Sequence, residues 1–166
     1  MLYIKLVWMY VIAMFTTIFI YPLLHEGGHL LAALLVGAEV VEMSVFPIPY
    51  VSMFVDPYDA LGRVVIGMCG MVFPMICIVF RPKHFVSSIA LSTIVFVNAI
   101  AWLLSCVAIV ANRLGLCWKN EDVITVIQSM EEAEAFVFFF CLAAFITSLY
   151  VLHKKKSVCH IMAFFE

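Results

Sequence analysis

The sequence predicts an all-α polytopic membrane protein with about four transmembrane helices, a kinked first segment and a small membrane-associated β-hairpin. The 166 residues are 66% hydrophobic and 12% charged, with a mean hydropathy of +1.16. Soluble domains are about 45–50% apolar and about 25% charged. Several apolar runs are long enough to cross a bilayer, and one short stretch alternates as strands do. We expect a single integral membrane domain over residues 1–166, with a three-span core over residues 10–125 and an extra helix and basic tail over residues 126–166.

The first apolar segment, residues 2–36, is too long for one upright span. At 1.5 Å per residue it gives about 50 Å of helix, against a bilayer core of about 30 Å. Pro22 lacks an N–H and tends to break or kink a helix. We therefore expect one span that ends near Pro22 and a second helical piece that ends at Gly37.

The later elements are predicted from apolar runs and from the Pro and Gly residues that separate them. Residues 41–46 and 50–55 are rich in β-forming residues and flank a Pro-Ile-Pro turn, which predicts two strands. Residues 61–80 predict a second span, with Gly62, Gly67 and Gly70 spaced for close helix contact. Residues 85–110 predict a third span that contains Asn98. A short amphipathic helix is expected from Glu121, and residues 136–152 predict the last span.

The strongest chemical signal is His25-Glu26-Gly27-Gly28-His29 in the first apolar segment. His25 and His29 are four residues apart, so on a helix they share one face and can bind one metal ion. Glu26 lies just off that face, where it can polarise a water. An ionisable group at the bilayer centre costs about 3 kcal/mol or more, so three within five residues favour a functional role over hydrogen-bonded helix packing. This is the His-Glu-x-x-His pattern of zinc peptidases.

A catalytic zinc usually has a third protein ligand and one open position. In the expected topology the later histidines, His84, His153 and His160, belong to the opposite side of the membrane. The acidic candidates on the correct side are Asp56, Asp59, Glu121 and Asp122. Asp122 opens a helix directly after the third span. From the residues alone it is equally a ligand or a carboxylate stabilised by the helix dipole, which contributes about 0.3–1 kcal/mol.

These residues give the chain a resemblance to the site-2 protease family of intramembrane zinc metalloproteases. The matching features are His25-Glu26-Gly27-Gly28-His29 and an aspartate after the third span; fainter ones are the hairpin and Gly67-Met68-Cys69-Gly70. Asn112 and Asp122 follow the order of the family's later motif, an asparagine, often a proline, and then Asp-Gly. The proline is missing, and Val123 stands where glycine is usual.

The resemblance implies that His25, His29 and Asp122 hold Zn²⁺, with Glu121 as the substitute for Asp122. It implies that Glu26 activates water for hydrolysis of peptide bonds in membrane-embedded substrates. We further expect the hairpin to pair with an extended substrate through an edge strand, at Tyr50, Val51, Ser52 and Met53.

Charge and cysteine content limit the partners. The net charge is −2 and Lys154–Lys156 is the one basic tract, so nucleic-acid binding has no support. The six cysteines form no Cys-x-x-Cys pair, which argues against a disulfide framework or a thiolate zinc site. The expected partners are the lipid bilayer and a membrane protein or peptide substrate, selected by access through the membrane or by a regulatory membrane partner or oligomer.

Four crossings place both termini on one side. That side collects six Lys and Arg residues (Lys5, Arg81, Lys83 and Lys154–Lys156), and the other has three (Arg63, Arg113 and Lys119). The positive-inside rule makes the first side cytoplasmic.

Three other functions compete with proteolysis. A non-proteolytic membrane zinc-binding scaffold does not need a carboxylate beside its first histidine. A metal transporter should carry polar groups through several spans, and Asn98 is the one amide deep in the third. A structural membrane protein without a metal leaves the three ionisable groups without a role. The metal itself is open from the residues, because imidazole–carboxylate sites accept several divalent ions.

Overall fold

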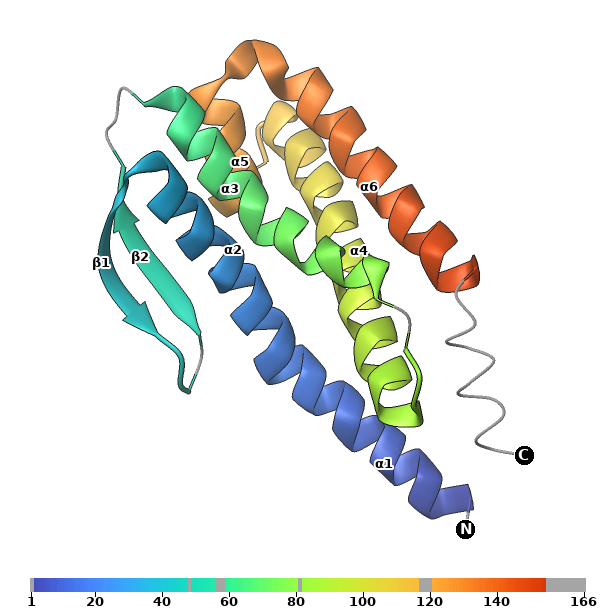
Figure 1. The fold of residues 1–166 in the computed structure, drawn as a ribbon. Coiled ribbons are helices and arrows are strands. Elements are labelled where there is room, and N and C mark those ends of the chain that lie inside the picture. The colour runs from blue at the N-terminus through green and yellow to red at the C-terminus, as the bar shows by residue number, and fades with distance from the viewer. Residues whose placement is uncertain (1, 48, 56–58, 81, 117–120, 155–166) are drawn as a thin grey trace.

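Four helices that are long and apolar enough to cross a bilayer form the frame of the protein. They are Tyr3–Val36, Ala60–Val79, Phe85–Arg113 and Glu134–Lys154. The computed structural model describes residues 2–47, 49–55, 59–80, 82–116 and 121–154. The predicted all-α polytopic fold with a small hairpin is confirmed (Figure 1).

The elements follow one another with short connections. In chain order they are α1 (Leu2–Phe15), the π-helical turn η1 (Thr16–Ile20), α2 (Tyr21–Val36), β1 (Glu39–Ser44), β2 (Tyr50–Phe54), α3 (Ala60–Met75), the 3₁₀ turn η2 (Ile76–Val79), α4 (Phe85–Arg113), α5 (Glu121–Ser129), the 3₁₀ turn η3 (Glu131–Ala133) and α6 (Glu134–Lys154).

The irregularity expected in the first segment is η1, which directly precedes Pro22. Pro22 has no N–H for the carbonyl four residues earlier, and a π turn re-spaces the hydrogen bonds at this point. The chain nevertheless stays helical from Tyr3 to Val36, so the two expected pieces form one continuous helix of 34 residues. This helix does end at Gly37 as predicted, where the φ of +75° suits glycine.

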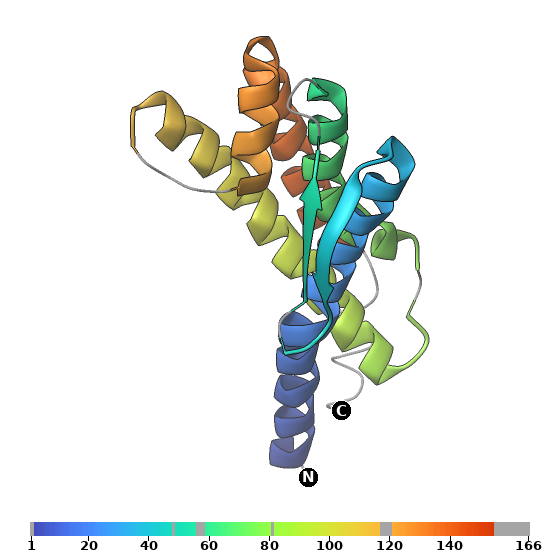
Figure 2. The same ribbon diagram turned by 90° about the vertical axis from the view of Figure 1, so that its left-hand side faces the viewer.

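The predicted hairpin is confirmed, and it lies against α2 (Figures 1 and 2). β1 begins at Glu39, two residues earlier than expected, and pairs antiparallel with β2 in a register that places Met43 opposite Val51. The second span, Ala60–Val79, is shifted by one residue from the predicted range, and the third and fourth spans are two to three residues longer than predicted at one or both ends. α4 runs on to Arg113 and α6 begins at Glu134.

Two apolar clusters hold the elements together. The smaller joins α2, α3 and the hairpin around Ala32, Ala33 and Ile66. The larger joins α3, α4, α5 and α6; its buried members are Met71, Trp102, Cys106, Ile109, Val123, Val126, Ile127, Val137, Cys141 and Ala144. Val123, Val126 and Ile127 are the apolar stripe of α5, spaced three and four residues apart. Their burial fixes the rotation of this short helix against α3 and α4.

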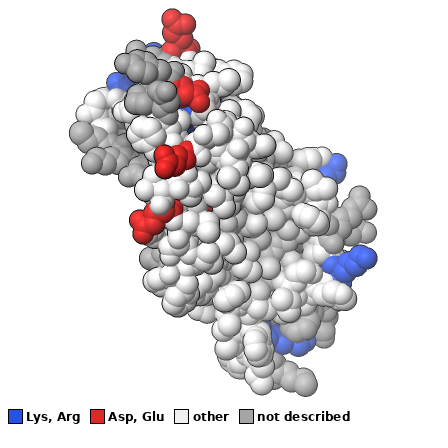
Figure 3. Space-filling view, turned by 60° about the vertical axis from the view of Figure 1, so that its left-hand side comes forward, with Lys and Arg blue, Asp and Glu red and all other residues white. Residues whose placement is uncertain are grey.

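The first span begins at the end of the bundle toward which the last span runs, as expected for four crossings. In Figure 1 the start of α1 and the end of α6 both point toward the lower end of the bundle, and α1 begins well below the level at which α6 ends. Acidic side chains gather toward the opposite end, and most of the basic ones lie away from it (Figure 3).

Candidate metal centre

The two histidines of the motif lie one helical turn apart on α2 with their Nε2 atoms facing each other. The two Nε2 atoms are 3.2 Å apart, and the rings meet edge to face with their centroids at 4.7 Å. His29 is buried, with 8% of its surface exposed. The spacing of four residues therefore places both imidazoles on one face, as predicted.

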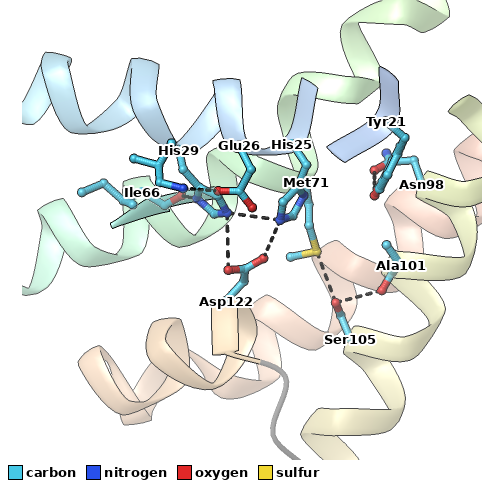
Figure 4. A network of polar contacts seen from close by, with 11 residues as sticks. Tyr21, His25, Glu26, His29, Ile66, Met71, Asn98, Ala101, Ser105 and Asp122 are labelled. Atoms are coloured by element: carbon cyan, nitrogen blue, oxygen red, sulfur yellow. Dashed lines mark hydrogen bonds and ion pairs between the residues drawn. The ribbon is translucent and has the colours of Figure 1, made fainter. Parts of the chain in front are cut away.

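Asp122 of α5 brings a carboxylate against both imidazoles. Its Oδ2 lies 3.1 Å from His25 Nε2, and its Oδ1 lies 3.4 Å from His29 Nε2 (Figure 4). Asp122 precedes the buried stripe of α5 by one residue, so the packing that fixes α5 also aims this side chain at α2. One ligand atom from each of the three residues lies within 4.8 Å of the others.

The electrostatics favour an ionised Asp122. Burial raises the pKa of a carboxyl group, but the contacts with His25 and His29 outweigh that effect and hold the pKa of Asp122 well below its usual range. A carboxylate that stays ionised can act as a metal ligand.

His29 is oriented by a main-chain carbonyl of α3. Its Nδ1 lies 2.8 Å from the Ile66 carbonyl oxygen. Because that oxygen can only accept, Nδ1 carries the proton and Nε2 keeps its lone pair on the side of His25 and Asp122.

Two glycines of α3 make room for this arrangement. A Cβ at Gly70 would lie 2.3 Å from His29 Nε2, and a Cβ at Gly67 would lie 3.0 Å from the Asp122 carbonyl oxygen. The helix that holds the Ile66 carbonyl thus has no side chain where the imidazole and the start of α5 approach it.

Glu26 stands between the histidines and the hairpin. Its Oε2 accepts a hydrogen bond of 3.0 Å from the Val51 N–H of β2. This N–H therefore points away from β1, and the edge of β2 faces the centre rather than the outside.

A cavity of about 790 Å³ opens over these groups. Its walls come from α2, β2, α3 and α5. Among its lining residues are the two histidines, Glu26 and Asp122, together with the four predicted substrate-binding residues Tyr50, Val51, Ser52 and Met53. The candidate metal ligands, the Glu26 carboxylate and the inner edge of β2 therefore line the same cavity.

The geometry fits a tetrahedral ion. Ligand atoms about 2.0–2.2 Å from one zinc lie about 3.3–3.6 Å apart. The two Nε2 atoms are 3.2 Å apart, and each lies 3.1 to 3.4 Å from a different oxygen of Asp122, so binding through a single oxygen requires the carboxylate to turn toward the ion. Two imidazoles and one carboxylate form a donor set that zinc accepts, and the cavity leaves a fourth side open.

The other predicted ligand candidates lie elsewhere or outside the described residues. The Asp59 carboxylate caps α3 by accepting from the Gly62 N–H at 2.8 Å. His84 directly precedes α4, and His153 lies in the last turn of α6; both of these helix ends lie away from α5. Asp56 and His160 are outside the described residues, as is the side chain of Glu121.

Sequence reasoning missed three contributors. The Ile66 carbonyl belongs to the main chain, so no residue type announces it. Gly70 was interpreted as a helix-contact residue, not as space for an imidazole. Tyr21, which stacks on His25 and donates to Asn98, lies one turn before the motif, and a tyrosine in an apolar helix carries no specific sign of such a contact.

Comparison of the chain with protein-family profiles, with curated proteins and with solved structures found no match.

Proposed function

We propose that the protein is an intramembrane zinc metalloprotease that hydrolyses peptide bonds of membrane-embedded substrates. The observation that carries this proposal is the convergence of His25, His29 and Asp122 beside Glu26 in one cavity. Three ligands with a free fourth side and an adjacent carboxylate are what hydrolysis at zinc requires. The resemblance of the motif to the site-2 protease family points to the same chemistry.

The roles of the side chains follow from their positions. His25, His29 and Asp122 hold the ion, and the Ile66 carbonyl fixes the ring of His29. Zinc bound there supplies Lewis-acid activation of the water and of the scissile carbonyl. The Glu26 carboxylate takes a proton from the attacking water and returns it to the departing amine.

The substrate enters as an extended segment along β2. A helix protects its own amides, so a transmembrane substrate must unwind locally before cleavage. The Val51 N–H points toward the cavity, and the Met53 N–H, two residues further along the strand, points the same way. A substrate strand that pairs with this edge lies directly over Glu26 and the histidines.

The same ligands suit a membrane zinc-binding scaffold or a metal transporter. Both alternatives leave Glu26 without a task beyond its contact with Val51. Replacement of Glu26 by glutamine therefore separates the three functions. A protease keeps its zinc and loses cleavage, whereas a scaffold or transporter keeps its activity.

The experiment uses purified protein in vesicles together with a panel of single-span membrane proteins, and mass spectrometry identifies the fragments. We expect the wild-type protein to cut within or next to a span. Glu26→Gln should cut about 10²- to 10⁴-fold more slowly with an unchanged zinc content, because a positioned acid–base group contributes about that factor.

Glu39→Gln is the matched control, because Glu39 is an exposed acid on β1 outside the large cavity. It should cut at the wild-type rate. Cleavage by Glu26→Gln at the wild-type rate would contradict the proposal.

A further inference from the structure

Asn98 is a buried amide in the third span that the proposed chemistry does not use. It lies in the middle of α4, with 1% of its surface exposed. Its Oδ1 accepts a hydrogen bond of 3.1 Å from the Tyr21 hydroxyl, while its Nδ2 has no hydrogen-bond partner among the described groups. Burying an amide side chain costs free energy unless the amide is hydrogen-bonded, and polar groups inside membrane spans are usually functional. The bond between Asn98 and Tyr21 therefore indicates a functional role.

Tyr21 connects Asn98 to the metal centre. It lies four residues before His25 on α2, and the two rings stack with their centroids 6.2 Å apart and their planes at 27°. In Figure 4 Tyr21 and Asn98 lie on the side of His25 that faces away from His29. Tyr21 and His25 also line a second cavity, of about 300 Å³, with Glu26, Met71 and Asp122 among its other walls.

The two histidines differ in how they are held. His29 has a main-chain carbonyl on its Nδ1. The Nδ1 of His25 is buried and has no hydrogen-bond partner within the described part of the chain. Metal-bound histidines are normally oriented by a hydrogen bond to the second ring nitrogen. The structure offers His25 the face of Tyr21 in place of such a bond.

We propose that Tyr21 and Asn98 are positioning residues that hold His25 ready for the metal. The Tyr21 ring limits the rotation of the imidazole, and the bond to Asn98 ties that ring to α4. The pair therefore couples the α2 ligand helix to the third span. This inference rests on the proposed function in one respect, namely that His25 is a metal ligand.

The test measures zinc affinity by competition with a chelator, and the ligand geometry by the visible spectrum of the Co²⁺-loaded protein. Tyr21→Phe keeps the aromatic ring and removes the hydrogen bond to Asn98. Asn98→Leu removes the acceptor of that bond at similar side-chain volume. Tyr21→Leu removes the ring that stacks on His25. We expect each variant to bind zinc about 10- to 100-fold more weakly, the usual effect of losing a group that supports a ligand. The Co²⁺ spectrum should change with it.

A double variant tests the tie itself. If the hydroxyl and the amide act through one bond, Tyr21→Phe combined with Asn98→Leu should weaken zinc binding no more than either change alone. Ser88→Ala is the matched control, because Ser88 is another buried polar residue of α4 and its hydroxyl donates to the His84 carbonyl at the start of that helix. Its zinc affinity and Co²⁺ spectrum should equal those of the wild type.

The outcomes separate the two proposals. Zinc affinities of the three single variants within about twofold of the wild type, with unchanged Co²⁺ spectra, would overturn the positioning role and leave the metal centre intact. Additive losses in the double variant would overturn the tie. A wild-type protein that binds neither zinc nor Co²⁺ would overturn the metal centre and this inference together.

Discussion

At the scale of single residues, the centre depends on a missing side chain as much as on its ligands. Gly70 faces the His29 ring, where a Cβ would lie 2.3 Å from Nε2. Gly70→Ala should push the imidazole away from Asp122 and lower zinc affinity by at least about tenfold, an effect comparable to the loss of a supporting group. Competition with a chelator measures the zinc affinity of the variant.

Gly27 provides the control for that substitution. It lies inside the motif, but a Cβ there would meet only the Phe73 ring, at 3.9 Å. Gly27→Ala should bind zinc as the wild type does. Equal zinc affinity in both alanine variants would show that the space at Gly70 does not matter to His29.

The sequence predicts the part of the metal centre that is formed by residues close together in the chain. His25 and His29 share a helical face because they are four residues apart, and this spacing is visible in the chain. The approach of Asp122 depends on the packing of α5 against α3 and α4, and Asp122 comes about a hundred residues after the histidines in the sequence. No spacing rule covers such a contact, so the acidic candidates stayed open until the fold was known.

At the scale of elements, the edge of β2 is the feature that a substrate would use. Val51→Pro removes the N–H that points into the cavity and leaves the β1–β2 ladder bonds in place, because prolines are tolerated at such edge positions. We expect cleavage to fall by at least about tenfold with zinc content unchanged, because the variant loses the N–H that bonds to Glu26 Oε2 and that a substrate strand would use.

Met43→Pro is the matched change on the other strand. Met43 lies opposite Val51, so its N–H points away from β2 toward the outer edge of the hairpin. It should leave cleavage near the wild-type rate. If both proline variants lose cleavage equally, the hairpin matters only as a folded unit and not through its inner edge.

The long first helix shows that residue types alone do not predict where a helix is interrupted. Pro22 indicated an interruption, and the structure has one at Thr16–Ile20. The chain continues without a break because a π turn absorbs the missing hydrogen bond, and residue preferences do not distinguish that solution from a break. The hairpin was predicted more closely, since its strands are separated by a clear proline turn.

At the scale of the whole molecule, charge gives the expected orientation. The described basic residues at the end shared by the first and last spans are Lys5, Lys83 and Lys154, and the acidic side chains gather toward the other end (Figure 3). The residues that line the cavity come from the half of the bundle nearer that acidic end, where α3 begins and toward which α5 runs. From the positive-inside rule we expect the termini to lie in the cytoplasm and the metal centre to lie nearer the outer face.

Reporter fusions to the end of the full chain test this orientation. A fluorescent protein fused there should be fluorescent, and alkaline phosphatase, which is active only outside the cytoplasm, should be inactive. The reverse pattern would place the cavity nearer the cytoplasm. It would contradict the orientation without affecting the metal centre.

The most direct test of the central claim is metal analysis of the purified full chain, with wild type, His25→Ala and Asp122→Ala compared at equal protein concentration. We expect about one zinc ion per wild-type chain and a loss of most of it in both variants, because each variant removes one of three proposed protein ligands. Equal zinc in all three proteins, or none in the wild type, would contradict it.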